Sequence, residues 1–147
     1  MLQIRRIKPE DIDFVLELAK ESGCSNGKLL ANIENFLICE SDNVKCGCGC
    51  LIPLGSTGLI SWIIVKESYR HQKLGGAIAK SLLNIAERMG IKEVYAAGIC
   101  GDFLAAMGFV KCESKEVIED MGEKLGYIVE ECFEVALEGY FKPCSNK

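Results

Sequence analysis

The sequence predicts an α+β fold with a mixed central sheet, because the order of its strands and helices differs between the two halves of the chain. In the N-terminal half, apolar strands at 36–40, 44–54 and 59–66 follow one another through the turns SDN and GSTG, which is typical of antiparallel pairing. In the second half, a helical pattern at 74–89 connects the strand at 59–66 to a strand at 92–98. Two strands joined through a helix run parallel, so this half contains a βαβ unit.

The remaining elements follow from local patterns. A strand at 3–7 opens the fold, and Pro9 then begins a helix whose apolar residues recur at helical spacing until Gly23. A short helical piece at 28–35 leads into the antiparallel strands. After residue 98 we expect a short helix at 101–107 that leads to the segment GFVKC, then a helix at 114–126 and a closing strand at 132–140.

Length and composition limit the class of protein. The 147 residues fit one domain, 1–147, with a single core. Hydrophobic residues make up 49% and charged residues 26% of the chain, a soluble globular balance. No apolar run approaches the roughly 20 residues that cross a bilayer, so we expect no membrane partner. A net charge of -4 without a basic tract argues against nucleic acid as a partner.

Nine cysteines are a high count for this length. Because the number is odd and the N-terminus lacks the apolar core of an export signal, we expect free thiols and a cytoplasmic protein. The run CGCGC invites a zinc interpretation, but a regular strand would place Cys46, Cys48 and Cys50 on one face, roughly 6.5–7 Å apart. Zinc needs each sulfur about 2.3 Å from the metal. We therefore expect no metal, thiols packed against a helix, and glycines where another element crosses closely.

Acidic residues gather near the end of the chain, where nine lie between Glu113 and Glu138. They fit the solvated face of a helix together with exposed strand positions. They also fit an acidic rim that attracts a cationic substrate.

The loop RHQKLGGA, at 70–77, lies between an apolar strand and the strongest helical pattern in the chain. A helix N-terminus after such a loop presents backbone N–H groups to a phosphate. Gly75 and Gly76 would let the backbone approach a ligand, although close packing also explains them. Positive charge at the rim comes from Arg70, His71 and Lys73. The motifs G-x-x-x-x-G-K-[ST] and G-x-G-x-x-G are absent, so neither a nucleotide triphosphatase nor a dinucleotide fold is indicated.

The segment from Gln72 to Ala77 fits the signature Q/R-x-x-G-x-G/A, and through it the chain resembles the GNAT superfamily of N-acetyltransferases. The preceding IIVKESYRHQ, the later FLAAMGF and the opening IRRIKPEDIDFVLEL resemble the corresponding segments of that family in the same order. The resemblance thus covers nearly the whole chain. The layout is most similar to the amino-acid N-acetyltransferase type, as in N-acetylglutamate synthase domains.

This resemblance implies a GNAT fold and acetyl-CoA as the cosubstrate. It implies that the strand at 59–66 carries a bulge and splays from the next strand, so that backbone groups near Ile63 and Val65 bind the pantetheine arm. A backbone N–H there would polarise the thioester carbonyl and stabilise the oxyanion. The amides of 71–76 would hold the pyrophosphate. The residues implied in cofactor binding are Ile63, Val65, Arg70, His71, Gln72, Lys73, Leu74, Gly75 and Gly76.

Two positions depart from the family pattern. Many members place a glutamate early in the central strand as general base, where this chain has Gly58, Leu59 and Ile60. Many place a tyrosine that protonates the leaving thiolate, where this chain has Leu104. The candidate substitutes are Ser61, Cys100 and Asp102. Each also has a structural explanation, so the sequence assigns no catalytic residue.

The sequence therefore predicts an N-acetyltransferase that moves an acetyl group directly from acetyl-CoA to the primary amine of a small molecule, with an amino acid as one option. Binding geometry would supply much of the acceleration. The alternative is a non-catalytic acyl-CoA-binding sensor or partner domain, which the missing glutamate and tyrosine leave open. A redox- or metal-responsive protein that uses its thiols is a third hypothesis. The expected partner is the amine substrate, and a homodimer is left open.

Overall fold

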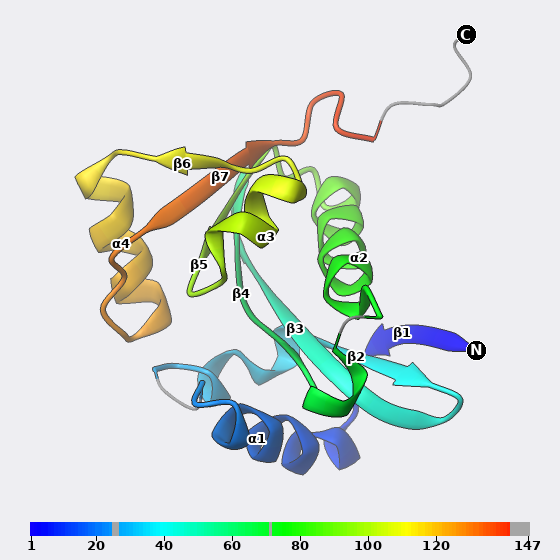
Figure 1. Cartoon of the computed structure of the whole chain (residues 1–147). Coiled ribbons are helices and arrows are strands. Elements are labelled where there is room, and N and C mark those ends of the chain that lie inside the picture. Colours follow the sequence, from blue (N-terminus) through cyan, green and yellow to red (C-terminus); the bar gives the residue numbers. More distant parts are fainter. Residues whose placement is uncertain (25–26, 71, 142–147) are drawn as a thin grey trace, which may run out of the picture.

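The computed structural model describes residues 1–24, 27–70 and 72–141, which form a seven-stranded sheet in the order β1-β2-β3-β4-β5-β7-β6 (Figure 1). The strands are β1 (Leu2–Arg6), β2 (Phe36–Ser41), β3 (Val44–Leu54), β4 (Thr57–Val65), β5 (Glu93–Ala97), β6 (Val110–Cys112) and β7 (Cys132–Ala136). The α-helices are α1 (Ile12–Glu21), α2 (Leu74–Arg88), α3 (Gly101–Ala106) and α4 (Lys115–Leu125). Short 3-10 helices are η1 (Pro9–Asp11), η2 (Leu30–Asn35) and η3 (Glu67–Tyr69).

The sheet is mixed. Strands β1 to β4 pair antiparallel in sequence order, and β4 pairs parallel with β5 across the helix α2. Strand β7 then lies antiparallel between β5 and β6. The predicted α+β fold, with an antiparallel N-terminal half and a βαβ unit, is confirmed.

The closing strand is shorter than the predicted 132–140, because β7 ends at Ala136. The chain turns directly afterwards: the Tyr140 N–H donates to the Leu137 carbonyl at 3.0 Å. Gly139 has a φ of 75°, in the left-handed region that glycine adopts without strain. Residues 137–140 therefore form a turn and do not extend the sheet.

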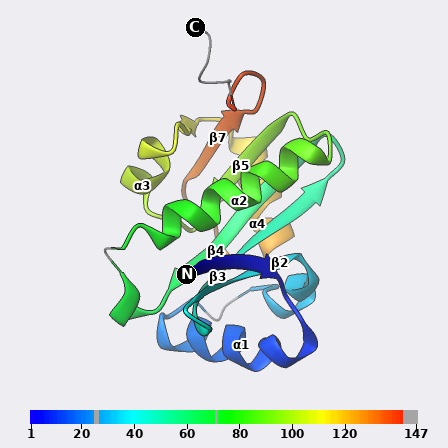
Figure 2. The same ribbon diagram turned by 90° about the vertical axis from the view of Figure 1, so that its right-hand side faces the viewer.

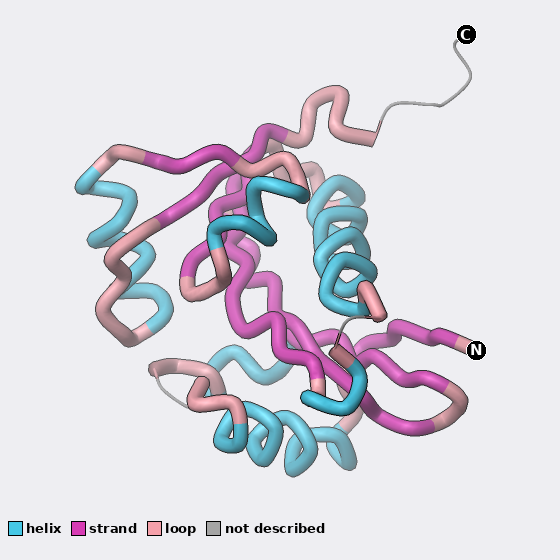
Figure 3. Tube along the Cα trace, in the orientation of Figure 1, coloured by secondary structure: helices cyan, strands magenta, loops and turns pink. Residues whose placement is uncertain are grey.

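Helices cover both faces of the sheet, and each face has its own apolar core. One core joins residues of α1 and α4 to the sheet, and the other joins residues of α2 and α3 to the opposite face. Figure 2 shows α2 lying across the face that is turned toward the viewer, and Figure 3 shows helices on both sides of the strands. The approach of α2 is close: a Cβ added to Gly49 would lie 2.5 Å from Cγ2 of Ile78. The predicted close crossing over the glycines of CGCGC is confirmed.

The three cysteines of CGCGC do not share one face, so that prediction is wrong for Cys46. Pairing between β2 and β3 shifts from Cys39↔Gly47 to Glu40↔Lys45, which makes Cys46 an extra residue in β3. The bulge turns Cys46 toward α2, where its sulfur lies 3.6 Å from that of Cys39. Cys48 and Cys50 pack on the face of α1.

The cysteines in the described part of the chain are free thiols. Burial raises the pKa of Cys48 to about 12, so its sulfur is a neutral apolar group at neutral pH. Within the same residues, no three His, Cys, Asp or Glu side chains gather in a way that could hold a metal ion. Nor does any helix there have the length and apolar character needed to cross a membrane.

Candidate cofactor and acceptor site

Strands β4 and β5 separate midway along β4. Their parallel pairing runs only from Thr57↔Glu93 to Ile60↔Ala96. Beyond that point the antiparallel register with β3 also shifts, so that Trp62 and Ile63 together face the single residue Gly49. The bulge and the splay that the resemblance implied are therefore confirmed.

The bulge carries an unusual backbone conformation. Trp62 has a φ of 57°, in the left-handed region that bulky residues rarely occupy. Such a conformation costs roughly 1–3 kcal/mol and persists where the surroundings fix it. Here the indole packs between two aromatic rings, with its centroid 6.2 Å from that of Phe36 and 6.1 Å from that of Tyr127. Packing of the indole thus holds the bulge in place.

The two predicted pantetheine-binding positions differ in their backbone surroundings. Ile63 has no Cα partner in the registers of β4 with β3 or β5, so neither ladder uses its backbone groups in register. Val65 pairs with Gly47, and its carbonyl accepts a hydrogen bond from Nε of Arg70 at 3.1 Å. Trp62 shares the lack of partners seen at Ile63, so the bulge at Trp62 and Ile63 is the part of β4 where a ligand can add to the strand.

Helix α2 begins directly after the loop that holds the signature. Lys73 stands at its N-cap with a φ of 63°, and the helix follows from Leu74. The first N–H groups of an α-helix have no partner within the helix, and they carry the positive end of the helix dipole. This end of α2 therefore suits a negatively charged ligand such as a phosphate.

Gly75 and Gly76 lie in the first turn of α2, and packing does not require glycine at both. A Cβ added to Gly76 would meet no atom within 4 Å, and one added to Gly75 would meet only the ring of Phe103, at 3.5 Å. Neither residue has a positive φ. In a helix glycine costs roughly 0.5–1 kcal/mol relative to alanine. Close packing, the other explanation that the sequence left, does not hold at Gly76.

A pocket of about 340 Å³ lies at this end of α2. Its lining residues are Val65, Tyr69, Arg70, Lys73, Leu74, Gly75, Gly76 and Phe103. The structure thus brings together six of the nine predicted cofactor-binding residues. Ile63 and Gln72 do not line this pocket, and His71 lies outside the described residues. Sequence reasoning had not assigned Tyr69 and Phe103 to the site, because aromatic residues carry no phosphate signature.

A second pocket, of about 320 Å³, lies where the chain leaves β5. Two loops form it, at 98–101 and 127–131. Behind it, the Ser61 hydroxyl donates to the Ala97 carbonyl at 3.1 Å and lies 2.9 Å from the hydroxyl of Tyr127. Ser61 is the first residue of β4 beyond its pairing with β5, so this pocket borders the point where the two strands separate. Helix α3 contributes to both pockets through Gly101 and Phe103.

The candidate substitutes for the missing proton carriers have different surroundings. Ser61 is buried and hydrogen-bonded, whereas Cys100 is exposed and lines the second pocket. Asp102 is exposed on the first turn of α3 and does not line that pocket. Leu104, at the usual tyrosine position, is buried in the core beneath α2.

Tyr127 is the functional candidate that sequence reasoning missed. Burial raises the pKa of its hydroxyl, and the hydrogen bond with Ser61 acts in the opposite direction. The phenol is therefore neutral at neutral pH. The two residues stand 66 positions apart in the chain, so no local pattern relates them.

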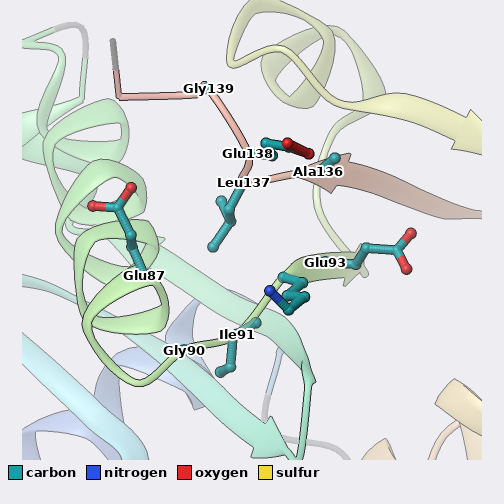
Figure 4. A pocket seen from close by; sticks show the side chains of 9 residues that line it. Glu87, Gly90, Ile91, Glu93, Ala136, Leu137, Glu138 and Gly139 are labelled. Atoms are coloured by element: carbon teal, nitrogen blue, oxygen red, sulfur yellow. The ribbon is translucent and has the colours of Figure 1, made fainter. Parts of the chain in front are cut away.

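The acidic residues near the end of the chain do not form one rim. Glu130 and Glu131 line the second pocket, and Lys111 lies 3.5 Å from a carboxylate oxygen of Glu131. Glu116 and Asp120 line a separate hollow beside α4. A further pocket, of about 520 Å³, lies at the far end of α2 (Figure 4). Its charged residues are Glu87, Lys92, Glu93 and Glu138, and it contains none of the predicted site residues.

The chain belongs to the acetyltransferase (GNAT) family, whose family model matches residues 26–113. Among curated proteins it is similar to an amino-acid acetyltransferase of Yersinia enterocolitica, with 30% identity over 102 residues. That match covers 63% of this chain and 23% of the relative. An amino-acid acetyltransferase of Shewanella oneidensis is 27% identical over 103 residues, which again cover 23% of that protein. The chain thus matches about a quarter of the length of these relatives.

Solved structures have the same fold. N-acetylglutamate synthase from Neisseria gonorrhoeae, in complex with coenzyme A and N-acetyl-glutamate, superposes with a TM-score of 0.77 at 21% identity, over 93% of this chain and 35% of that one. PaiA N-acetyltransferase from Thermoplasma acidophilum, in complex with coenzyme A, superposes with a TM-score of 0.71 at 18% identity, over 92% and 99%. The predicted GNAT fold is confirmed, and the relatives agree with the predicted amino-acid N-acetyltransferase layout.

Proposed function

We propose that residues 1–147 form a single acetyltransferase domain that transfers an acetyl group directly from acetyl-CoA to the primary amine of a small molecule. One observation carries this proposal: two helical glycines stand at the N-terminus of α2, and at Gly76 the space for a side chain is open. Glycine there lowers the stability of the helix, and neither packing nor backbone conformation accounts for it. Close approach of a ligand to the backbone does.

The pyrophosphate of acetyl-CoA is the ligand group that suits this end of α2. The backbone N–H groups of 71–76 would bind it, and the helix dipole would favour its negative charge. Arg70 and Lys73, which line the pocket, would add positive charge. Leu74 and Phe103 give the pocket its apolar side.

The pantetheine arm would then extend along β4 past the bulge. Ile63 offers backbone groups outside the registers of both neighbouring strands, so the arm can hydrogen-bond there as an added strand would. A backbone N–H at the bulge would polarise the thioester carbonyl and stabilise the oxyanion. Fixing the thioester beside the amine supplies the remaining acceleration through proximity.

An amino acid is the acceptor that the relatives favour. The curated relatives are amino-acid acetyltransferases, and N-acetylglutamate synthase was solved with N-acetyl-glutamate. A cytoplasmic location and a homodimer stay predictions.

Binding of coenzyme A tests the proposal. A ligand that binds only the folded state stabilises it, by about 2.7 kcal/mol at a hundred times its Kd. We expect acetyl-CoA to raise the melting temperature of the wild type. Gly75→Glu should abolish that increase, because it places bulk and negative charge where the pyrophosphate binds. Asn84→Glu adds the same charge at an exposed position further along α2 and is the matched control.

The outcomes separate the two function hypotheses. An equal increase in melting temperature for Gly75→Glu and the wild type would place the cofactor elsewhere. Binding of acetyl-CoA without acetylation of any amine would instead favour the non-catalytic acyl-CoA-binding domain. Acetylation of an amine, measured through release of the free thiol of coenzyme A, would establish the enzyme.

A further inference from the structure

The hydrogen bonds around Ser61 fix the direction in which the Tyr127 hydroxyl donates. A carbonyl oxygen only accepts, so Ser61 gives its one hydroxyl proton to the Ala97 carbonyl, at 3.1 Å. The contact of 2.9 Å between Ser61 and Tyr127 must then use the proton of Tyr127. The phenol oxygen keeps a free lone pair, so toward any further group Tyr127 acts as a hydrogen-bond acceptor.

The surroundings place this oxygen beside Gly98, which lines the second pocket together with Tyr127. A Cβ added to Gly98 would lie 2.3 Å from the Tyr127 hydroxyl oxygen, and both residues line the pocket. Gly98 has a φ of 72°, so glycine is needed there for conformation and for space. On the other side, a Cβ added to Gly27 would lie 2.9 Å from Cδ2 of the ring. The tyrosine is thus fixed in position by its neighbours.

We propose that the pocket formed by 98–101 and 127–131 receives the acceptor, and that Tyr127 orients the attacking amine by accepting a hydrogen bond from its N–H. This inference rests on the proposed acetyltransferase function. It suits a neutral primary amine, which has two N–H groups to donate and one lone pair for attack. When one N–H of the amine donates to the Tyr127 oxygen, the position of the amine is fixed beside the separation of β4 and β5. Its lone pair then points in a defined direction for attack.

The reaction balances without a residue of the chain changing its charge. The amine lone pair forms the C–N bond, and the C–S bond breaks as the thiolate leaves. The new amide nitrogen gives one proton to water, and the thiolate takes one from water. The hydroxyl of Tyr127 stays protonated throughout and keeps its hydrogen bond to Ser61. Tyr127 therefore positions the substrate and does not exchange a proton with it.

Tyr127→Phe tests this role because it removes the oxygen and keeps the ring against Trp62. We expect kcat/KM for the amine to fall about tenfold, the size of one lost hydrogen bond of roughly 1.4 kcal/mol, mainly through a higher KM for the amine. The KM for acetyl-CoA should stay within twofold of the wild type. Suitable amines are L-glutamate, putrescine and phenylethylamine, each measured by thiol release.

Tyr140→Phe is the matched control, because the Tyr140 hydroxyl donates to the Met107 carbonyl at 2.6 Å and neither residue lines the pocket. It should leave both KM values unchanged. Ser61→Ala gives an independent measurement, which can be made even if Tyr127→Phe does not fold. Without Ser61 the Tyr127 hydroxyl is free to rotate, so its oxygen no longer presents a fixed acceptor to the amine. The KM for the amine should therefore rise severalfold.

Unchanged amine kinetics in Tyr127→Phe, or in Ser61→Ala where the first variant does not fold, would overturn the inference and leave the proposed function in place. An equal loss for the amine and for acetyl-CoA would also overturn it, since a merely structural role predicts that pattern. No turnover by the wild type would overturn the proposed function and this inference together.

Discussion

Gly76 is a helical residue whose side-chain position is empty, and this leads to a test at the scale of one residue. We expect Gly76→Ala to raise the free energy of unfolding of the unliganded protein by about 0.5–1 kcal/mol, because alanine is the better helix former and nothing blocks its methyl group. The same methyl group should reduce the stabilisation by coenzyme A, because it stands where the ligand approaches the backbone. Urea denaturation with and without coenzyme A measures both effects.

Ser81→Ala, further along the same helix, is the control for that measurement. It should leave the stabilisation by coenzyme A as it is in the wild type. If the Gly76→Ala variant is stabilised by coenzyme A as much as the wild type, glycine at 76 has no role in binding, and the main support for the cofactor site is lost.

Residues also show what the sequence could and could not predict. Gly75 and Gly76 were predicted to bind the cofactor because both belong to one short sequence motif. Such a motif can be recognised from the sequence alone. Tyr127 was not, because its relation to Ser61 exists only after the loop at 127–131 has packed beside the end of β5. A contact across 66 residues depends on tertiary packing, which no local pattern records.

At the scale of elements, strands and helices were predictable and registers were not. Alternation and turn residues indicated β2, β3 and β4 with ends close to those observed. The bulge at Cys46 and the shift at Trp62 come from pairing with neighbouring strands and from the close packing of α2 on Gly49. A shift by one residue turns a side chain to the other face, which is why the predicted face of Cys46 was wrong.

Asp11 connects three elements and gives a test at this scale. Its side chain is fully buried, and its carboxylate accepts hydrogen bonds from Arg5 of β1 at 2.7 and 3.0 Å. Nζ of Lys45 in β3 lies 2.7 Å from Oδ1 of Asp11, and the Lys8 N–H donates to Oδ2 of Asp11 at 2.7 Å. The hydrogen bonds from the Arg5 guanidinium, helped by those from Lys45 and the Lys8 backbone, hold the pKa of Asp11 well below its usual range in spite of its burial.

We expect Asp11→Asn to lower the free energy of unfolding by about 3–5 kcal/mol, as is usual when one partner of a buried ion pair is removed. A depressed folded-state pKa stabilises the protein at pH values above the unfolded pKa, about 3.9, and this contribution is lost as the pH falls toward the folded pKa. The difference between wild type and variant should therefore be full above about pH 5 and shrink below about pH 4. Denaturant titrations at several pH values measure it.

Asp13→Asn removes the same charge at an exposed position of α1 and should change the stability little at any pH. A difference between wild type and Asp11→Asn that stays constant down to pH 3 would contradict the linkage. It would mean that the carboxylate is not stabilised by its partners in the folded protein.

At the scale of the whole molecule, the site is assembled from both halves of the sheet. The proposed cofactor pocket uses the end of β4 and the start of α2, and the proposed acceptor pocket uses loops that follow β5 and α4. The separation of β4 and β5 lies behind the acceptor pocket, and α3 lines both pockets. The early residues of β4 supply no general base to this arrangement. Gly58, Leu59 and Ile60 are buried and carry no ionisable group.

The molecule as a whole therefore predicts a characteristic dependence of rate on pH. An attacking amine must be neutral, yet an alkylamine with a pKa near 10.4 is almost fully protonated at pH 7. Tyr127 does not supply this base, because burial raises the pKa of its hydroxyl and so keeps the phenol protonated. We expect the substrate amine to lose its proton to ordered water. Log kcat/KM should rise with pH toward the pKa of the amine itself, and the inflection should move to lower pH with a less basic amine.

Variants of the ionisable groups around the acceptor pocket decide whether the enzyme supplies a base. Cys100, Glu130 and Glu131 line that pocket, and Asp102 lies nearby on α3. Cys100→Ala, Asp102→Asn, Glu130→Gln and Glu131→Gln should each leave the shape of the pH profile unchanged, even where the rate falls. A side-chain base would instead give an inflection set by its own pKa, near the working pH. An inflection fixed between about pH 6 and 9 for amines of different basicity, and removed by one of these substitutions, would identify that residue as the base and refute deprotonation by water.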